Sequence, residues 1–117
     1  MNPWLAAAGL LGAAGVVLGA LGSHALTVER PDQFELANRY HLIHAVLIAA
    51  LSLAWSNGGV FRQLVIAGFV LGTMLFCGSL YLSSLNLAGS GLAPVGGSML
   101  IISWVALAAG AFLPQKK

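Results

Sequence analysis

Long uncharged apolar runs, separated by short polar or glycine-rich segments, define the pattern of this chain. Four such runs cover about 3–26, 38–56, 61–85 and 94–113. A stretch of about 20 apolar residues is the length of a membrane-spanning helix. The pattern therefore predicts an all-α polytopic membrane protein, with four transmembrane helices packed as a compact bundle in a single domain over 1–117. No room is left for a soluble domain.

The segments between the runs carry ordinary helix-end and turn signals. Asn2 and Pro3 suit the N-cap and first turn of the first helix. Asp32 and Glu35 have capping-box spacing and predict that the second helix begins at Asp32, with two amphipathic turns before the apolar part. SNGG at 56–59 predicts a turn, and Pro94 opens the last helix after an uncharged glycine-rich loop. A signal peptide is the competing interpretation of the first run, but no Lys or Arg precedes it, so we expect a retained span.

Charge is scarce and scattered. Only 7% of the residues are charged, against about 25% in soluble domains. A formal charge of +2 is too small to suggest nucleic-acid binding. Cys77, the single cysteine, cannot form an internal disulfide and is expected to be a packing residue. The pattern implies the lipid bilayer as the main partner and no nucleic acid.

An even number of spans places both termini on one side of the membrane. That side would hold Arg62, Lys116 and Lys117, and the other Arg30 and Arg39. The positive-inside rule then favours cytoplasmic termini by three cations against two.

Small residues recur on one face of the first and third runs. Lipid offers no hydrophobic reason for helices to associate, so close backbone approach through small residues is the usual device. The predicted packing residues are Gly12, Gly15, Gly19, Gly22, Gly68 and Gly72. The spacing leaves open whether these faces meet a helix of the same chain or a second copy. Because four helices enclose little interior, a homo-oligomer is slightly favoured.

The segment RYHLIHA at 39–45 places unusual polar side chains where the second apolar run begins. His41 and His44 are three residues apart and can point to one region of a helix surface. His24, near the end of the first run, is expected at the same membrane face. The pattern predicts a polar patch there, with Arg39 and Tyr40 as the interfacial anchor.

Three interpretations of this patch remain open. The histidines can tie the hairpin of the first two helices to the loop before the fourth, which is the favoured interpretation. They can form a proton- or ligand-sensitive site, because histidine titrates near physiological pH. They can also bind a metal or haem, although no cysteine or carboxylate stands at ligand spacing beside His24, His41 and His44.

The chain resembles the YgdD family of small bacterial inner-membrane proteins, a domain of unknown function. The resemblance is carried by GALGSHAL at 19–26, RYHLIHA at 39–45, FCGSLYLSSL at 76–85 and APVGGSMLIISW at 93–104. Ser103 replaces the glycine expected before the last tryptophan, which is a change of one small residue for another. The resemblance implies four transmembrane helices in the cell inner membrane and no assigned reaction. It adds Pro94, Gly96 and Gly97 to the histidines and Tyr40 as candidate site residues.

No catalytic constellation is recognisable. The chain has no HExxH motif, no phosphate loop and no nucleophile beside a plausible base in sequence. We therefore expect a non-enzymatic binding or interaction protein without a cofactor. The alternative is a proton- or ion-coupled transporter or channel component that uses His24, His41 and His44. The two halves of the chain share too little to indicate the inverted repeat that many transporters have.

Overall fold

The computed structural model describes residues 1–56 and 58–113, and these residues form four long helices. The helices are α1 (Pro3–His24), α2 (Pro31–Ala54), α3 (Gly59–Ser84) and α4 (Ala93–Gly110). All four are long and apolar enough to cross a membrane. The predicted fold class, an all-α bundle of four membrane helices, is confirmed.

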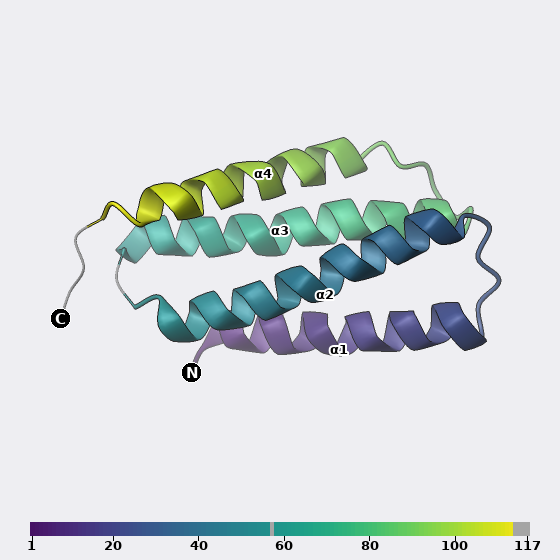
Figure 1. Cartoon of the computed structure of the whole chain (residues 1–117), viewed down its shortest axis with the longest axis horizontal. Coiled ribbons are helices and arrows are strands. Elements are labelled where there is room, and N and C mark those ends of the chain that lie inside the picture. The colour runs from purple at the N-terminus through teal and green to yellow at the C-terminus, as the bar shows by residue number, and fades with distance from the viewer. Residues whose placement is uncertain (57, 114–117) are drawn as a thin grey trace.

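The helices run alternately up and down, and each packs against its neighbours in the sequence (Figure 1). The N-terminus and the end of α4 lie at the same end of the bundle, as an even number of spans requires. Lys116 and Lys117, used above to orient the chain, lie outside the described residues, as does Asn57 of the predicted SNGG turn.

The start of the second helix differs from the prediction. The helix begins at Pro31, and Arg30 is its N-cap without a side-chain hydrogen bond, so Asp32 and Glu35 do not form a capping box. Proline at the first position is already set to the helical φ angle and lacks only a hydrogen that would be unbonded there. Asp32 lies in the first turn, where its charge suits the positive end of the helix dipole. By contrast, the predicted start of α1 is confirmed, since the Asn2 side chain accepts from the Leu5 amide.

The glycine face of α1 is directed at α2. A Cβ atom built on Gly15 would lie 2.6 Å from Leu42 Cδ2, and one built on Gly19 would lie 2.9 Å from Asn38 Oδ1. A Cβ on Gly22 would overlap the Phe34 ring, whereas Gly12 is in looser contact with Ala45. The small residues thus let α1 approach α2 within one chain.

The glycines of α3 are directed at α4. Gly68 faces Ser103, and Gly72 faces Leu100. The two backbones approach each other at Gly96, where an added Cβ would lie 2.8 Å from the Cα atom of Phe76 and 2.9 Å from the carbonyl of Gly72. Both predicted glycine faces therefore pack against a helix of the same chain, so neither is left open to a second copy of the protein.

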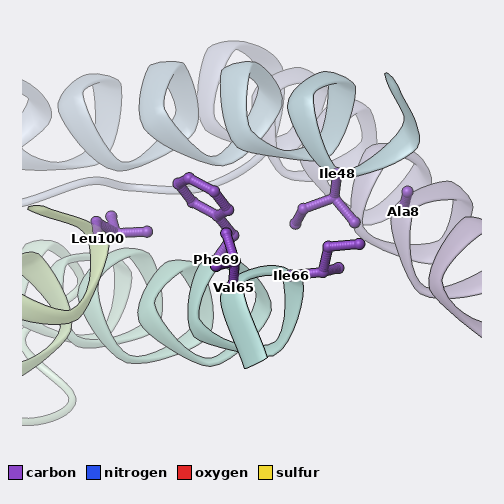
Figure 2. Close-up of a cluster of buried hydrophobic side chains, with 6 residues drawn as sticks. All are labelled: Ala8, Ile48, Val65, Ile66, Phe69 and Leu100. Atoms are coloured by element: carbon purple, nitrogen blue, oxygen red, sulfur yellow. The ribbon is translucent and has the colours of Figure 1, made fainter. Parts of the chain in front are cut away.

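One apolar cluster draws on all four helices. Ile48 of α2 and Ile66 and Phe69 of α3 are fully buried at its centre (Figure 2). Ala8 of α1 and Leu100 of α4 lie at its two sides. This cluster holds the end of the bundle that contains the termini. The polar side chains discussed below lie further along the same interior.

Candidate functional site

His44 of α2 is buried, and both of its ring nitrogens have a hydrogen-bond partner, one in α2 and one in α4. Its Nδ1 lies 2.7 Å from the carbonyl oxygen of Tyr40. The indole N–H of Trp104 donates to its Nε2 across 3.1 Å. A carbonyl can only accept and an indole N–H can only donate. His44 is therefore a neutral imidazole with its hydrogen on Nδ1, and its lone pair is already used.

His41 takes part in a second polar network that joins α1, α2 and α3. Its Nδ1 lies 3.0 Å from the Tyr81 hydroxyl. The Asn38 amide nitrogen lies 3.1 Å from the same hydroxyl and 2.8 Å from the carbonyl of Gly15. The two amide hydrogens of Asn38 thus go to Gly15 and to the Tyr81 oxygen. The Tyr81 hydrogen is then left for His41 Nδ1, which places the hydrogen of His41 on Nε2.

The His41 side chain borders a groove of about 190 Å³ between α1, α2 and α3. We call this the His41 groove; its lining residues are Leu11, Leu18, His41, Thr73, Met74, Cys77, Gly78 and Tyr81. No charged residue is among them. The groove is a mostly apolar recess, and a few of its lining residues carry polar atoms.

Two of those polar atoms have no partner. Four buried side-chain atoms in the described part of the chain lack a hydrogen bond, and His41 Nε2 and Thr73 Oγ1 are two of them. His41 is 5% exposed and Thr73 is 1% exposed. The backbone of Leu11 lies near the His41 ring, but no bond of ordinary geometry joins it to Nε2. Because a buried donor without a partner is costly, two of them in one groove are a feature that requires an explanation.

The structure does not bring the three histidines together. His41 lies beside Gly15 of α1, where an added Cβ would be 3.4 Å from its ring. His24 is exposed nine residues further along α1, which is about 14 Å at 1.5 Å per residue. Within residues 1–56 and 58–113, no group of three His, Cys, Asp or Glu side chains is placed to hold a metal. The expectation that His24, His41 and His44 share one patch is therefore wrong. The expected tie to the loop before α4 is wrong as well, since His41 bonds Tyr81 within α3 and His44 bonds Trp104 within α4.

The segment RYHLIHA also lies deeper than expected. It occupies the middle of α2, whose first two turns pack along α1 as part of the same helix. Arg39 is exposed and borders a different pocket beside Glu35 and Ser23. The ring of Tyr40, which is 38% exposed, lies between the rings of His44 and Phe76. Tyr40 thus belongs to the packing around His44, whereas Arg39 is separate from both histidines.

Pro94, Gly96 and Gly97 lie apart from the His41 groove. Pro94 is in the first turn of α4. Gly96 and Gly97 pack against Phe76 of α3, so their role is the close crossing of α3 and α4. They touch the histidine region only indirectly, because Phe76 also contacts Tyr40.

Four members of the two networks and the groove escape prediction from the sequence: Asn38, Thr73, Tyr81 and Trp104. Each is a lone polar or amphipathic residue in a helix, and nothing in its immediate neighbours says what it faces. Tyr81 and Trp104 do stand inside the quoted segments FCGSLYLSSL and APVGGSMLIISW. A hydroxyl or an indole N–H within a membrane helix needs a partner, and this is the available signal.

Comparison with known proteins places the chain among membrane proteins of unassigned role. Residues 18–97 match the family model "Protein of unknown function (DUF423)". The chain is 27% identical over 117 residues to a "UPF0382 membrane protein" of Haemophilus influenzae, covering 95% of this chain and 94% of that one. It is 34% identical over 106 residues to the "UPF0382 membrane protein YwdK" of Bacillus subtilis, covering 82% and 85%. No solved structure matches. The matched family region contains Asn38, His41, Thr73 and Tyr81.

Proposed function

The chain belongs to the DUF423 family, and we propose that it is a non-enzymatic membrane protein that binds a small ligand in the His41 groove. The observation that carries this proposal is that His41 and Thr73 line the same recess and that each has a buried polar atom without a partner among the described residues, Nε2 and Oγ1 respectively. A ligand that accepts hydrogen bonds from both would satisfy them. The Tyr81 hydroxyl bonds the His41 ring and is itself held by the Asn38 amide, so the ring is fixed in place.

Binding is favoured over catalysis by the surroundings of the two groups that could act as nucleophiles. These are the Cys77 thiol and the Thr73 hydroxyl, which both line the groove. Among the described residues, no base is hydrogen-bonded to the Thr73 hydroxyl, and the Cys77 side chain is buried in an apolar cluster. Activation of either nucleophile requires an adjacent base or a lowered pKa.

The test is the identification of what the protein carries. The protein is purified in mild detergent without a histidine tag and analysed by native mass spectrometry and elemental analysis. We expect a bound small molecule that is lost in His41→Ala and reduced in Thr73→Val. His24→Ala is the matched control, since His24 is exposed and distant, and it should retain the ligand. Retention of the same species by all three variants would contradict the proposed site, and so would a protein that carries nothing in any form.

The second candidate function is proton- or ion-coupled transport. It is favoured by one observation, the buried bond between His41 and Tyr81, since both groups can carry a proton. Asn38, the next member of the network, is an amide and does not pass a proton on. The test is flux in reconstituted vesicles. Transport that disappears in His41→Ala but persists in His24→Ala would favour this candidate over simple binding, and flux equal to that of empty vesicles would exclude it.

For the orientation we propose cytoplasmic termini in the bacterial inner membrane. The support is the positive-inside rule, because Arg62, Lys116 and Lys117 belong by sequence to the side of the termini, and Arg30 and Arg39 to the other. Reporter fusions after residue 117 and in the 86–92 loop would test it. Activity of a cytoplasmic reporter in the loop alone would reverse the assignment.

A further inference from the structure

The two unpartnered donors lie deep in the bundle. His41 is about 15 Å from the start of α2 and about 20 Å from its end, at 1.5 Å per residue. Thr73 is about 21 Å from the start of α3 and about 17 Å from its end by the same rise. A bilayer has a hydrocarbon core of about 30 Å, so both residues lie near its middle. The ester and head groups of phospholipids lie at the edges of that core and do not reach these donors.

The chemistry of the groove selects a neutral oxygen. The hydrogen-bond network places a hydrogen on His41 Nε2, as derived above, and the Thr73 hydroxyl has no other partner. Each group therefore has a hydrogen that no atom of the described residues accepts. No lining residue carries a charge, so an anion or cation in the groove would lose its hydration without a counter-ion. The remaining side chains, including Leu11, Leu18 and Met74, offer an apolar surface.

The size of the groove limits the part of the ligand that it can hold. A cavity of about 150 Å³ in another protein binds benzene, and the His41 groove has about 190 Å³. One ring, or a short chain of similar volume, fits this space. Because α1 packs along α2, and α3 packs on α2 and α4, the groove opens between α1 and α3, and a longer apolar tail can extend into the lipid.

We propose that the His41 groove binds a neutral, lipid-soluble molecule through one oxygen acceptor, a ketone, ether or hydroxyl oxygen carried on a single ring or a short chain. The oxygen accepts from His41 Nε2 and Thr73 Oγ1, and the apolar body lies against Leu11, Leu18 and Met74. This inference rests on the proposed function, because it names the class of ligand for the same groove.

Two reporters in the groove separate binding from hydrogen bonding. The Met74 side chain borders the groove, so a ¹³C-methyl label on methionine reports occupancy. A ¹⁵N label on histidine reports the hydrogen bond at His41 Nε2. Met99, which borders the apolar recess between α3 and α4, reports partition into other apolar sites. His24 and the fully bonded His44 are internal controls.

The experiment titrates the labelled protein in lipid nanodiscs with two probes of the same shape, cyclohexanone and methylenecyclohexane. We expect cyclohexanone to shift the Met74 methyl and the His41 Nε2 resonances together and saturably, with His24 and His44 unmoved. Methylenecyclohexane lacks the oxygen and with it both hydrogen bonds, so it should bind about a hundredfold more weakly, at about tenfold for each bond. Thr73→Val, a change of one hydroxyl for a methyl, removes one of the two bonds and should weaken cyclohexanone binding by about tenfold, with methylenecyclohexane binding unchanged.

The outcomes distinguish the two proposals. If both neutral probes bind equally, or if cyclohexanecarboxylate or cyclohexylammonium binds more tightly than cyclohexanone, the groove is a binding site but the neutral-acceptor class is wrong. If no probe moves the Met74 methyl saturably, and the purified protein carries no ligand, the proposed function fails as well. The wild-type titration needs no variant, so a folding defect in Thr73→Val does not affect it.

Discussion

Trp104 of α4 donates its indole N–H to Nε2 of His44 on α2, across 3.1 Å. His41, three residues earlier on the same helix, has the opposite set of partners, with a hydroxyl at Nδ1 and none at Nε2. One histidine therefore has both nitrogens engaged by the protein, whereas the other, which lines the groove, has one ring nitrogen without a partner in the described part of the chain. This difference separates a packing histidine from a candidate binding histidine.

The two buried histidines are predicted to be opposite neutral tautomers. Trp104 and the Tyr40 carbonyl fix the hydrogen of His44 on Nδ1, whereas Tyr81 and Asn38 fix that of His41 on Nε2. A ¹⁵N-histidine spectrum of the protein in nanodiscs should show one protonated nitrogen for each ring, Nδ1 in one and Nε2 in the other. His41→Gln and His44→Gln assign the two signals. Two rings of the same tautomer would contradict the two networks.

Loss of the Trp104 indole N–H should destabilise the bundle. In Trp104→Phe, the Nε2 lone pair of His44 stays buried without a donor, and we expect a loss of about 1 kcal/mol. This is the low end of the range for an unsatisfied buried group, because hydrogen bonds between membrane helices contribute less. The midpoint of thermal unfolding in detergent, followed by circular dichroism, measures the loss. Trp4→Phe is the matched control, since the Trp4 indole bonds the exposed side chain of Gln63. An equal or larger loss in Trp4→Phe would show that ring volume, and not the bond to His44, explains the effect.

The four spans could be predicted because lipid requires long apolar helices whatever they face. The packing glycines could be predicted as well, since Gly15 and Gly19 leave a flat face that lets another helix approach closely, here with the Leu42 and Asn38 side chains against it. The polar interior could not. The α4 sequence is apolar on nearly every side, and α2 carries polar residues on several sides, so the pattern does not indicate which way Trp104 or His41 points. The depth of His41 in the membrane depends on where the spanning part of α2 begins. The charged residues near Asp32 lead to a predicted span of 38–56, which places His41 near its start, whereas α2 is one continuous helix over Pro31–Ala54.

Gly96→Ala should be among the most damaging of the small substitutions. An added Cβ would lie 2.8 Å from the Phe76 Cα atom and 2.9 Å from the Gly72 carbonyl. Both neighbours are backbone atoms, so α4 must move away from α3, at a cost of about 1–3 kcal/mol. Thermal unfolding in detergent measures it. Gly9→Ala is the control, because a Cβ at Gly9 meets nothing within 4 Å; the idea fails if both variants unfold at the wild-type temperature.

Arg30 is predicted to hold the end of α3 from the loop between α1 and α2. The chain leaves α3 through Asn86, whose φ of 62° is left-handed, and the Leu87 amide bonds back to the Leu82 carbonyl at 2.8 Å. This is the Schellman arrangement, with asparagine in the position usually taken by glycine. The Arg30 guanidinium donates to the Ser83 carbonyl and, at 3.2 Å, to the Asn86 side chain. A cation at a helix C-terminus also suits the helix dipole.

Arg30→Gln removes that charge and the bonds to Ser83 and Asn86. We expect a loss of about 1 kcal/mol and faster hydrogen exchange at the Asn86 and Leu87 amides, because the last turn of α3 opens more often. Exchange measured by mass spectrometry on peptides that cover residues 82–92 reports this directly. Arg39→Gln is the matched control, since Arg39 is exposed and lies away from the end of α3. Equal protection of this segment in wild type and Arg30→Gln would show that the backbone bonds hold the helix end without the Arg30 side chain.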